Sequence, residues 1–450
     1  MAPDTSLPSD RPSHDGPDVA VEEVVGLCSE LIRFDSVNTG DPATIGDGEA
    51  RAARYLQEKL EEVGYETTYV EATPGRGNVI CRLPGADPSR GALLVHGHVD
   101  VVPADASEWT VDPFSGAVQD GYVWGRGAVD MKDMVAMTVA VARDFKRRGV
   151  VPPRDLIFAF MSDEEAGGLF GAHWLVEHHP ELFEGATEAI SEVGGYSITI
   201  GDDERAYLFA AAEKGVAWAT LTATGRAGHG SMINDDNAVT RIARAVTALG
   251  SHEFPIVRTA TINALLAKVT ELTGLEFPDD DLEGSIRKLG PVARILNATL
   301  RNTANPTMLS AGYKANVIPS TAKATVDCRV LPGSEDGFRE QVAEIVGPDV
   351  DIEWVWQPPL EYPASGDLVD AMAAALEAED PHGHLVPYML SGGTDNKAFA
   401  KLGVVGYGFS PLRLPADLDF SALFHGVDER VPIDALQFGV RVLDRLLRNC

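Results

Sequence analysis

Short apolar runs alternate with amphipathic helices through the first half of the chain, and this alternation is the feature that most constrains the fold. Apolar residues recur at helical spacing over 19–34 and 48–63, which predicts helices with one buried face. The runs expected to form strands are 67–70, 78–83, 92–95, 156–161 and 188–191. Strands that alternate with helices in this way indicate an α/β layer structure whose sheet is largely buried.

The pattern changes near Ala210, where GVAWATLTATG alternates like a half-exposed strand. The strands and helices that follow predict a separate α+β domain with one face of its sheet covered. Farther along the chain, apolar runs and helices alternate again as they did at the start. We therefore expect a disordered, proline-rich tail over 1–18, an α/β domain built from 19–209 and 332–450, and an inserted α+β domain at 210–331.

Composition argues against several classes of function. The chain of 450 residues carries 37 Lys and Arg against 68 Asp and Glu, which gives a net charge of −31 with neutral histidine. Nucleic-acid binding and docking on anionic lipid both need clustered basic residues, so neither partner is expected. No apolar run reaches the ~18 residues needed to span a bilayer. The four cysteines show no paired spacing and the N-terminus does not resemble a secretory signal, so we expect a cytoplasmic protein.

The first polar residues suited to chemistry lie in LLVHGHVDVVPAD, where an apolar run ends in His98 and Asp100. Ligands bind at the carboxyl ends of the strands in α/β sheets. Residues two apart point to the same side of an extended chain, so the Asp100 carboxylate can fix the tautomer of His98 and leave its other nitrogen for a metal. Taken alone, the pair is better explained as two polar residues at the end of a strand.

Three further segments repeat this arrangement. Asp130 follows a glycine-rich turn in GRGAVDMKD, Glu164 and Glu165 follow an apolar run in FAFMSDEEAGG, and Glu192 follows another in AISEVGG. Asp130 and the glutamate pair, taken singly, are explained by helix capping and the helix dipole. Together, so many carboxylates are costly unless a cation compensates them. Histidine and carboxylate ligands suit zinc, cobalt or manganese, and their number predicts two metal ions that share a bridging carboxylate.

Eight motifs in a fixed order then resemble a known family of proteins. They are LLVHGHVDVVP, WGRGAVDMKD, SDEEAGG, SEVGG, AGHGS, KANVIPSTAKATVDCRVLPG, SGGTDNKAF and HGVDERV. In this order they resemble the two-zinc amidohydrolases and exopeptidases, which include acetylornithine deacetylase, succinyl-diaminopimelate desuccinylase, aminoacylase, glutamate carboxypeptidase and carboxypeptidase S. The resemblance implies a zinc-exopeptidase-like catalytic domain, with a mixed sheet flanked by helices. It also implies that the inserted domain is a ferredoxin-like lid that forms a homodimer.

The resemblance implies which residues bind the metals. His98 and Glu192 would bind one zinc ion, Glu165 and His425 would bind the other, and Asp130 would bridge the two ions. Co²⁺ or Mn²⁺ would suit the same ligands as Zn²⁺. The ligands come from both ends of the chain, which agrees with an α/β domain interrupted by an insertion.

The resemblance also implies the residues that act on the substrate. Asp100 would orient His98, Glu164 would be the general base, and His229 would stabilise the oxyanion in the active site of a neighbouring subunit. The residues that would contact the substrate are Asn316, Arg329, Gly392, Gly393 and Thr394. Apart from the resemblance, His229 is explained as a surface histidine between glycines and Arg329 as a cation at a strand end, although arginine suits bidentate carboxylate recognition.

The function implied is hydrolysis of an amide or peptide bond in an N-acyl amino acid or small peptide with a free carboxylate. Hydroxide held by two zinc ions would attack the carbonyl, with a glutamate as the general base. One alternative is a catalytically inactive, metal-binding relative that acts as an interaction module. Another is a two-metal hydrolase of phosphate esters. The presence of Glu164 and His229 argues against the first alternative, and the lack of a clamp rich in Lys and Arg argues against the second.

Overall fold

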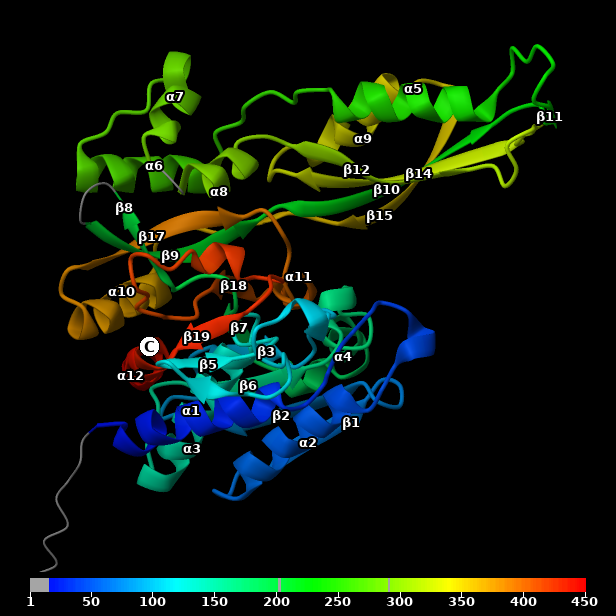
Figure 1. Cartoon of the computed structure of the whole chain (residues 1–450). Coiled ribbons are helices and arrows are strands. Elements are labelled where there is room, and N and C mark those ends of the chain that lie inside the picture. Colours follow the sequence, from blue (N-terminus) through cyan, green and yellow to red (C-terminus); the bar gives the residue numbers. More distant parts are fainter. Residues whose placement is uncertain (1–15, 201–203, 290–291) are drawn as a thin grey trace, which may run out of the picture.

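The computed structural model describes residues 16–200, 204–289 and 292–450 (Figure 1). Among these residues, ten strands form a large sheet whose main path is β1-β2-β6-β3-β7-β18-β9-β16, with β8 and β17 also paired to β9. The strands are β1 (Thr67–Glu71), β2 (Gly77–Leu83), β3 (Ala92–His98), β6 (Leu156–Met161), β7 (Ala186–Ser191), β8 (Ser197–Ile200), β9 (Glu204–Glu213), β16 (Leu360–Glu361), β17 (Gly383–Leu390) and β18 (Val405–Gly408).

The central strands β6, β3, β7 and β18 are parallel, whereas the outer strands β1 and β2 are antiparallel to their neighbours. The central strands are almost continuously apolar because both faces of the sheet are covered. Along β3, Leu93 and Val95 belong to the core on one face, and Leu94 belongs to the core on the other. Because parallel strands end at the same edge, the carboxyl ends of β6, β3 and β7 lie together.

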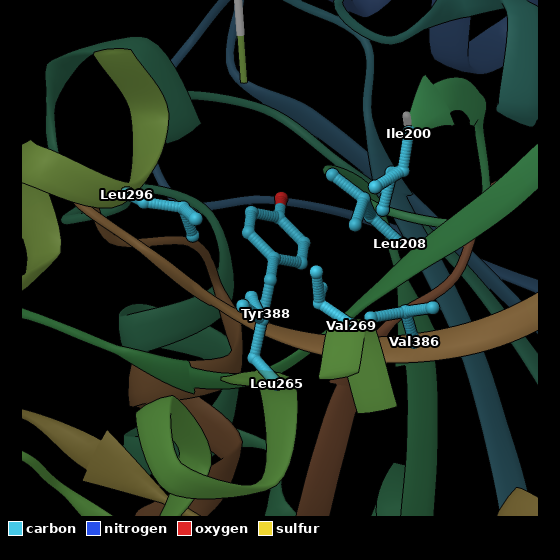
Figure 2. Close-up of a pocket in the computed structure, with 7 residues that line it drawn as sticks. All are labelled: Ile200, Leu208, Leu265, Val269, Leu296, Val386 and Tyr388. Atoms are coloured by element: carbon cyan, nitrogen blue, oxygen red, sulfur yellow. The ribbon is translucent and has the colours of Figure 1, made fainter. Parts of the chain in front are cut away.

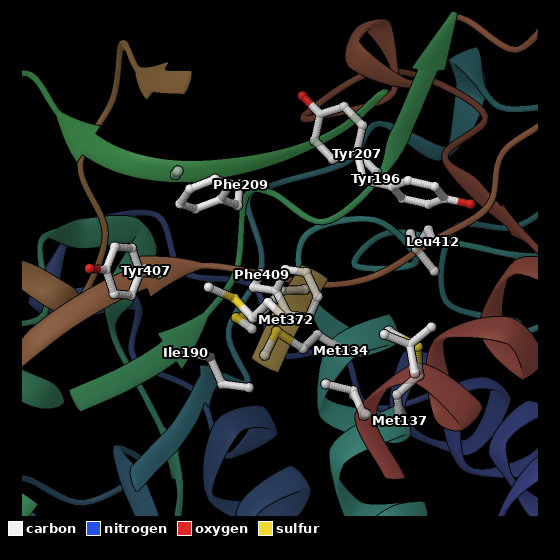
Figure 3. Close-up of a cluster of buried hydrophobic side chains, with 14 of the residues drawn as sticks. Met134, Met137, Ile190, Tyr196, Tyr207, Phe209, Met372, Tyr407, Phe409 and Leu412 are labelled. Atoms are coloured by element: carbon white, nitrogen blue, oxygen red, sulfur yellow. The ribbon is translucent and has the colours of Figure 1, made fainter. Parts of the chain in front are cut away.

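Helices cover both faces of the large sheet. On one face α1, α3, α10 and α12 pack against one another, and Figure 3 shows part of the core beneath them. Helix α2 packs on β1 and β2, and α4 and α11 cover the opposite face. The bounds are α1 (Asp18–Ile32), α2 (Gly48–Glu61), α3 (Lys132–Arg148), α4 (Ala172–His178), α10 (Asp367–Glu379), α11 (Asn396–Phe399) and α12 (Ile433–Asn449). Of the helices in the described ranges, none is both long enough and apolar enough to cross a bilayer.

A smaller antiparallel sheet lies beside the large one, in the order β12-β14-β10-β15 (Figure 1). Its elements are β10 (Gly215–Thr224), β12 (Thr303–Ala311), β14 (Thr321–Val330), β15 (Val350–Gln357), α5 (Ala238–Gly250) and α9 (Glu335–Val346). Helices α5 and α9 cover one face, where Ala217 and Leu221 of β10 are buried with Val326 of β14. Alternate residues of the same strands, such as Trp218, therefore point to the other face.

The chain crosses between the two sheets at Lys214, which separates β9 from β10. We expected the second unit to end at residue 331, but α9 packs on α5 and β15 pairs with β10, so the segment 335–357 lies with the small sheet. A helix followed by a strand looks the same in sequence whichever sheet the strand joins, so the local pattern does not locate this boundary. Residues 1–15 of the expected disordered tail lie outside the described residues.

The remaining elements connect or extend the two sheets. Helix α6 (Ala260–Thr273), although it falls within the expected insertion, packs against β17 and β9 of the large sheet. It is followed by α7 (Leu282–Arg287) and α8 (Val292–Thr299). Two short strands, β11 (Gly228–His229) and β13 (Val317–Ile318), pair with each other, and β4 (Val118–Gln119), β5 (Tyr122–Trp124) and β19 (Arg430–Pro432) form a third small sheet.

Candidate metal centre

The carboxyl edge of the parallel strands brings together the acidic and imidazole side chains expected from the sequence. His98 is the last residue of β3 and pairs with Met161, the last residue of β6. Glu164 and Glu165 follow β6 after a turn, and Glu192 directly follows β7. The topology of the sheet, rather than proximity in sequence, therefore gathers these groups.

His98 is 1% exposed and uses both ring nitrogens. Its Nε2 lies 3.1 Å from Asp130 Oδ1 and 3.4 Å from Glu192 Oε2. Its Nδ1 lies 3.0 Å from the backbone carbonyl oxygen of Asp100 and 3.4 Å from Oδ1 of that carboxylate. Asp100 thus contacts the nitrogen that faces away from the cluster. The nearer acceptor is its backbone oxygen.

Asp130 lies between two imidazoles that are far apart in the sequence. It stands between β5 and α3, so that Oδ1 faces His98 while Oδ2 lies 3.2 Å from His425 Nε2. His425 Nε2 is also 3.2 Å from Glu165 Oε2. One carboxylate therefore contacts both imidazoles, with Glu192 on the side of His98 and Glu165 on the side of His425.

This donor set fits two divalent cations. Ligand atoms of His98, Asp130 and Glu165 lie within 4.8 Å of one another, and so do those of His98, Glu164 and Glu192. Glu165 Oε1 is buried and has no hydrogen-bond partner among the described residues. A buried carboxylate oxygen without a partner is costly, and a bound cation would satisfy it. Imidazole with carboxylate is the ligand chemistry of zinc, cobalt and manganese sites.

Burial and close contact shift the pKa values of the carboxylates and imidazoles in this cluster. Burial raises the pKa of Glu192 to about 8. Burial, together with the charge of Glu192, raises the pKa of Glu164 well above its usual range. Hydrogen bonds to Asp130 and Glu165 raise the pKa of His425 to about 10. Burial alone would raise the pKa of Asp130, but the two imidazoles more than offset it and lower that pKa. The raised pKa values keep protons on Glu164, Glu192 and His425. Bound cations would replace those protons.

Sequence reasoning missed Glu429, which positions Asp130. Its side chain is fully buried, and Oε1 accepts hydrogen bonds from the backbone N–H groups of Val129 at 2.7 Å and Asp130 at 3.3 Å. Its other oxygen accepts from Arg126 Nη1 at 2.7 Å. The signal was present in HGVDERV, four residues after His425, but a glutamate in a loop has no pattern that marks it as buried.

A cavity of about 730 Å³ opens onto this cluster. Part of its wall is the uncovered face of the small sheet, where Val216 of β10 pairs with Arg329 of β14 and Trp218 pairs with Val355 of β15. Gly392, Gly393 and Thr394 also line the cavity. Asp395, which the sequence did not single out, lies beside them and is 5% exposed.

Arg329 lines the cavity and forms an ion pair with Asp327. Its Nε lies 2.6 Å from Asp327 Oδ1, and its Nη2 donates to Oδ2 of the same carboxylate at 3.0 Å. Asp327 thereby holds the guanidinium plane, and Nη1 remains a donor that neither of these bonds uses. The arrangement leaves part of the arginine available to a second carboxylate.

His229 and Asn316 are not brought to this cavity. Both are exposed, His229 at the end of β11 and Asn316 just before β13, and the Gly230 N–H donates to the Asn316 backbone oxygen at 2.9 Å. His229 Nδ1 lies 2.8 Å from Ser231 Oγ, a contact within its own loop. Neither residue is among those that line the cavity of the same chain.

A second cavity is too small to hold a ligand. It measures about 10 Å³ and lies among apolar side chains around Tyr388 (Figure 2). Tyr388 also borders the large cavity, and its hydroxyl donates to the backbone oxygen of Val193, next to Glu192, at 2.8 Å. A void of this size holds at most a single water, so we treat it as a packing gap.

Comparisons with known proteins agree with this site. The sequence profile described as peptidase family M20/M25/M40 matches residues 94–449. Aminoacylase-1 from Homo sapiens is 29% identical over 408 residues, which cover 88% of this chain and 89% of the human protein. A probable carboxypeptidase S-like 2 from Dictyostelium discoideum is 28% identical over 403 residues, covering 83% of this chain and 74% of that protein.

A solved structure shares the fold. The M20 family metallo-carboxypeptidase Sso-CP2 from Sulfolobus solfataricus aligns with a TM-score of 0.72 over 95% of this chain and 98% of that chain, at 17% identity. At this identity the likeness shows the fold alone. The mixed sheet flanked by helices that the sequence predicted is confirmed.

Proposed function

The chain belongs to the peptidase family M20/M25/M40, and from this premise we propose that it hydrolyses the amide bond of N-acyl amino acids or small peptides with two divalent metal ions. The observation that carries the proposal is the Asp130 carboxylate, whose two oxygens lie 3.1 and 3.2 Å from His98 and His425. Asp130 would therefore be able to hold two metal ions, one through each of its carboxylate oxygens. The relatives' names, aminoacylase and carboxypeptidase S-like protein, support amide cleavage.

Each metal position would be held by three side chains. His98, Glu192 and Asp130 would hold one ion, and Asp130, Glu165 and His425 would hold the other. When bound, two such ions polarise a carbonyl and lower the pKa of water. Zinc is the metal we propose, and cobalt or manganese would suit the same ligands.

We assign proton transfer to Glu164. Its Oε2 lies 4.0 Å from His98 Nε2, and its side chain lines the cavity. Burial and the charge of Glu192 raise its pKa, which suits a carboxylate that accepts a proton from water and then releases it to the leaving amine. Asp100 keeps the glutamate in place, because its Oδ1 accepts a hydrogen bond from the Glu164 N–H at 3.1 Å.

The cavity favours a substrate with one carboxylate and an apolar acyl group. Arg329 supplies the single cationic side chain among the residues that line it, apart from histidines. Val216, Trp218 and Val355 form an apolar wall beside that arginine. Such a wall removes apolar surface from water when an acyl chain binds, which stabilises the complex. We therefore propose N-acyl amino acids as the principal substrates.

We further propose that the protein acts as a homodimer in which His229 completes the site of the partner. The support is that His229 and Asn316 are exposed and lie outside the cavity of their own chain. An imidazole supplied from outside would donate a hydrogen bond where negative charge develops on the carbonyl oxygen. A cytoplasmic location remains our prediction. The four cysteines are all free and buried, which agrees with it.

The direct test is the release of free amine from a panel of N-acyl amino acids and dipeptides by zinc-loaded protein. We expect two metal ions per chain, cleavage of at least one N-acyl amino acid, loss of activity with a chelator, and recovery when zinc is restored. A protein that binds two ions and cleaves nothing would support the alternative of a catalytically inactive, metal-binding relative. Hydrolysis of p-nitrophenyl phosphate without amide cleavage would indicate a phosphatase.

A further inference from the structure

Asn38 lies behind the turn that follows β6, out of contact with the cavity. Its residue exposure is 4%, and its backbone N–H donates to the Val101 carbonyl oxygen at 2.9 Å. This bond ties the segment after α1 to the loop that follows β3. A side chain in this place can act on the metal centre only through the residues it touches.

The amide of Asn38 makes four hydrogen bonds. Nδ2 donates to Asp100 Oδ2 at 3.1 Å and to Asp163 Oδ1 at 2.9 Å. Oδ1 accepts from Arg76 Nη2 at 3.0 Å and from the Gly40 N–H at 3.0 Å. A primary amide has two N–H donors and two acceptor positions, so its hydrogen-bonding capacity is used in full.

The two carboxylates that Asn38 contacts shape the turn. Asp100 Oδ1 accepts from the Glu164 N–H at 3.1 Å, and Oδ2 accepts from the Glu165 N–H at 3.0 Å. Asp163 Oδ2 accepts from the Phe170 N–H at 2.9 Å, where the same segment leaves the turn. The Asn38 amide therefore connects Asp163, within the turn, to Asp100, which binds the turn from the loop after β3.

The charged groups around Asn38 explain why the side chain at this position is an amide and not a carboxylate. Asp100 and Asp163 are 0% and 2% exposed, and each accepts one of the amide's two N–H groups. Arg76, itself buried, pairs with Glu49 and lies 3.5 Å from Asp163 Oδ1. A carboxylate in place of the amide would add negative charge and remove both donors without changing the shape.

We propose that Asn38 is a positioning residue for the reaction: its two N–H groups hold Asp100 and Asp163 so that Glu164 and Glu165 keep their places at the metal centre. The inference deepens the proposed function and rests on it. Partners of this kind behind a metal site typically affect metal affinity or activity by about 10- to 100-fold when removed.

The test compares Asn38→Asp, which keeps the shape of the side chain, with Asn38→Ala. We expect both to lower kcat by about 10- to 100-fold with KM within about threefold of wild type, and the aspartate variant to be no better than the alanine variant. If Asn38 only fills space, the isosteric aspartate should keep near wild-type kcat while alanine does not. That order, or kcat within twofold of wild type in both variants, would overturn the proposal.

A readout independent of turnover is the visible absorption spectrum of the Co²⁺-substituted protein. We expect both Asn38 variants to shift the cobalt bands or weaken Co²⁺ binding, because Glu165 moves. Tyr65→Phe is the matched control, since it removes a buried hydrogen bond to the Ala142 oxygen without touching the turn, and it should keep the wild-type spectrum. Unchanged spectra and affinity in the Asn38 variants would contradict the proposal. If the wild type cleaves no amide at all, the proposed function fails, while the spectra still test the positioning role.

Discussion

The carboxyl edge of the large sheet and the uncovered face of the small sheet contribute to one cavity in different ways. At the edge, His98, Asp130 and His425 from distant parts of one chain meet at 3.1 to 3.2 Å. The small sheet supplies Arg329 and Trp218 to the wall, whereas His229, expected at an active site, is exposed elsewhere. The proposed metal ligands all come from one chain, and we infer that the groups that act on the substrate come from two.

The two regions differ because of how their side chains are held. Most side chains at the edge, though not His425, are buried or half-buried. Hydrogen bonds from the backbone fix their places, as when Asp100 accepts the backbone N–H groups of both Glu164 and Glu165. The face of the small sheet is open, and its arginine is held by the neighbouring Asp327. A change at the edge should therefore affect chemistry, and a change on the small sheet should affect substrate binding.

The largest effect is expected from Glu164→Gln, which tests whether the carboxyl edge carries out the chemistry. We expect kcat to fall by about 10²- to 10⁴-fold, the range for loss of a general acid–base group, while two metal ions remain bound. Steady-state kinetics and metal analysis on the same sample measure both quantities. Glu177→Gln, at an exposed position of α4, should keep wild-type turnover. Turnover within tenfold of wild type on every cleaved substrate would show that another group moves the proton.

The next largest effect is expected from His229→Ala, which tests whether the second region is completed by a partner. Loss of one oxyanion donor lowers kcat by about 10²- to 10³-fold, and metal content should not change. Mixing this variant with Glu164→Gln under conditions that exchange subunits should restore about a quarter of wild-type activity, since half of the dimers are mixed and each has one complete site. Absence of recovery despite subunit exchange would mean that His229 acts within its own chain or not at all.

The next prediction concerns His96, a residue of β3, and the pH dependence of folding stability. Burial lowers its pKa to about 4, and its Nε2 lies 3.0 Å from Asn396 Oδ1. Because the folded pKa is below the unfolded value of about 6.5, the unfolded state binds more protons between these values. The contribution of His96 to the free energy of unfolding is therefore fully present above pH 6.5. It is lost as pH falls toward 4, and the loss is about 2 kcal/mol at pH 5.

Urea unfolding of metal-free protein at pH 7 and pH 5 measures this loss. We expect His96→Gln to lose about 2 kcal/mol less than wild type between the two pH values. His178→Gln, at an exposed position of α4, should show the wild-type difference. An equal loss in His96→Gln and wild type would show that His96 is not the group responsible.

The smallest effect is expected from Trp218→Ala on the open face. Trp218 is 43% exposed, so its removal should cost about 1 kcal/mol of binding, or about fivefold in kcat/KM, for an N-octanoyl amino acid. An N-acetyl amino acid, with little apolar surface, should be cleaved almost as well as by wild type. Thr222→Ala, farther along β10 and outside the cavity lining, is the control. An equal loss of kcat/KM on both substrates would show that the acyl chain does not bind against Trp218.

Much of the fold and the metal centre could be predicted from the sequence. The family match and the shared fold confirm the family and the fold class expected from the eight motifs. His98, Asp130, Glu165, Glu192 and His425 lie together as expected, although their roles remain proposals. Apolar runs that end in acids are local patterns, and parallel strands place such ends side by side whatever lies between them.

Other features could not be predicted because they depend on pairing across long separations. The segment 335–357 looked like part of the α/β domain until β15 was found paired with β10. Asn38 and Glu429 act through hydrogen bonds to residues 62 and 300 positions away. Nothing in a single polar residue of a loop shows that it is buried or which carboxylate it will meet.

The family, the fold class and the residue types of the candidate site could be predicted from the sequence alone, because the kinds of side chain and their places at strand ends are local properties. Tertiary structure alone decided which groups touch, which face of the small sheet lines the cavity, and that His229 stays outside it. These depend on strand order and on the burial of charge, and both are properties of the assembled sheet rather than of any segment.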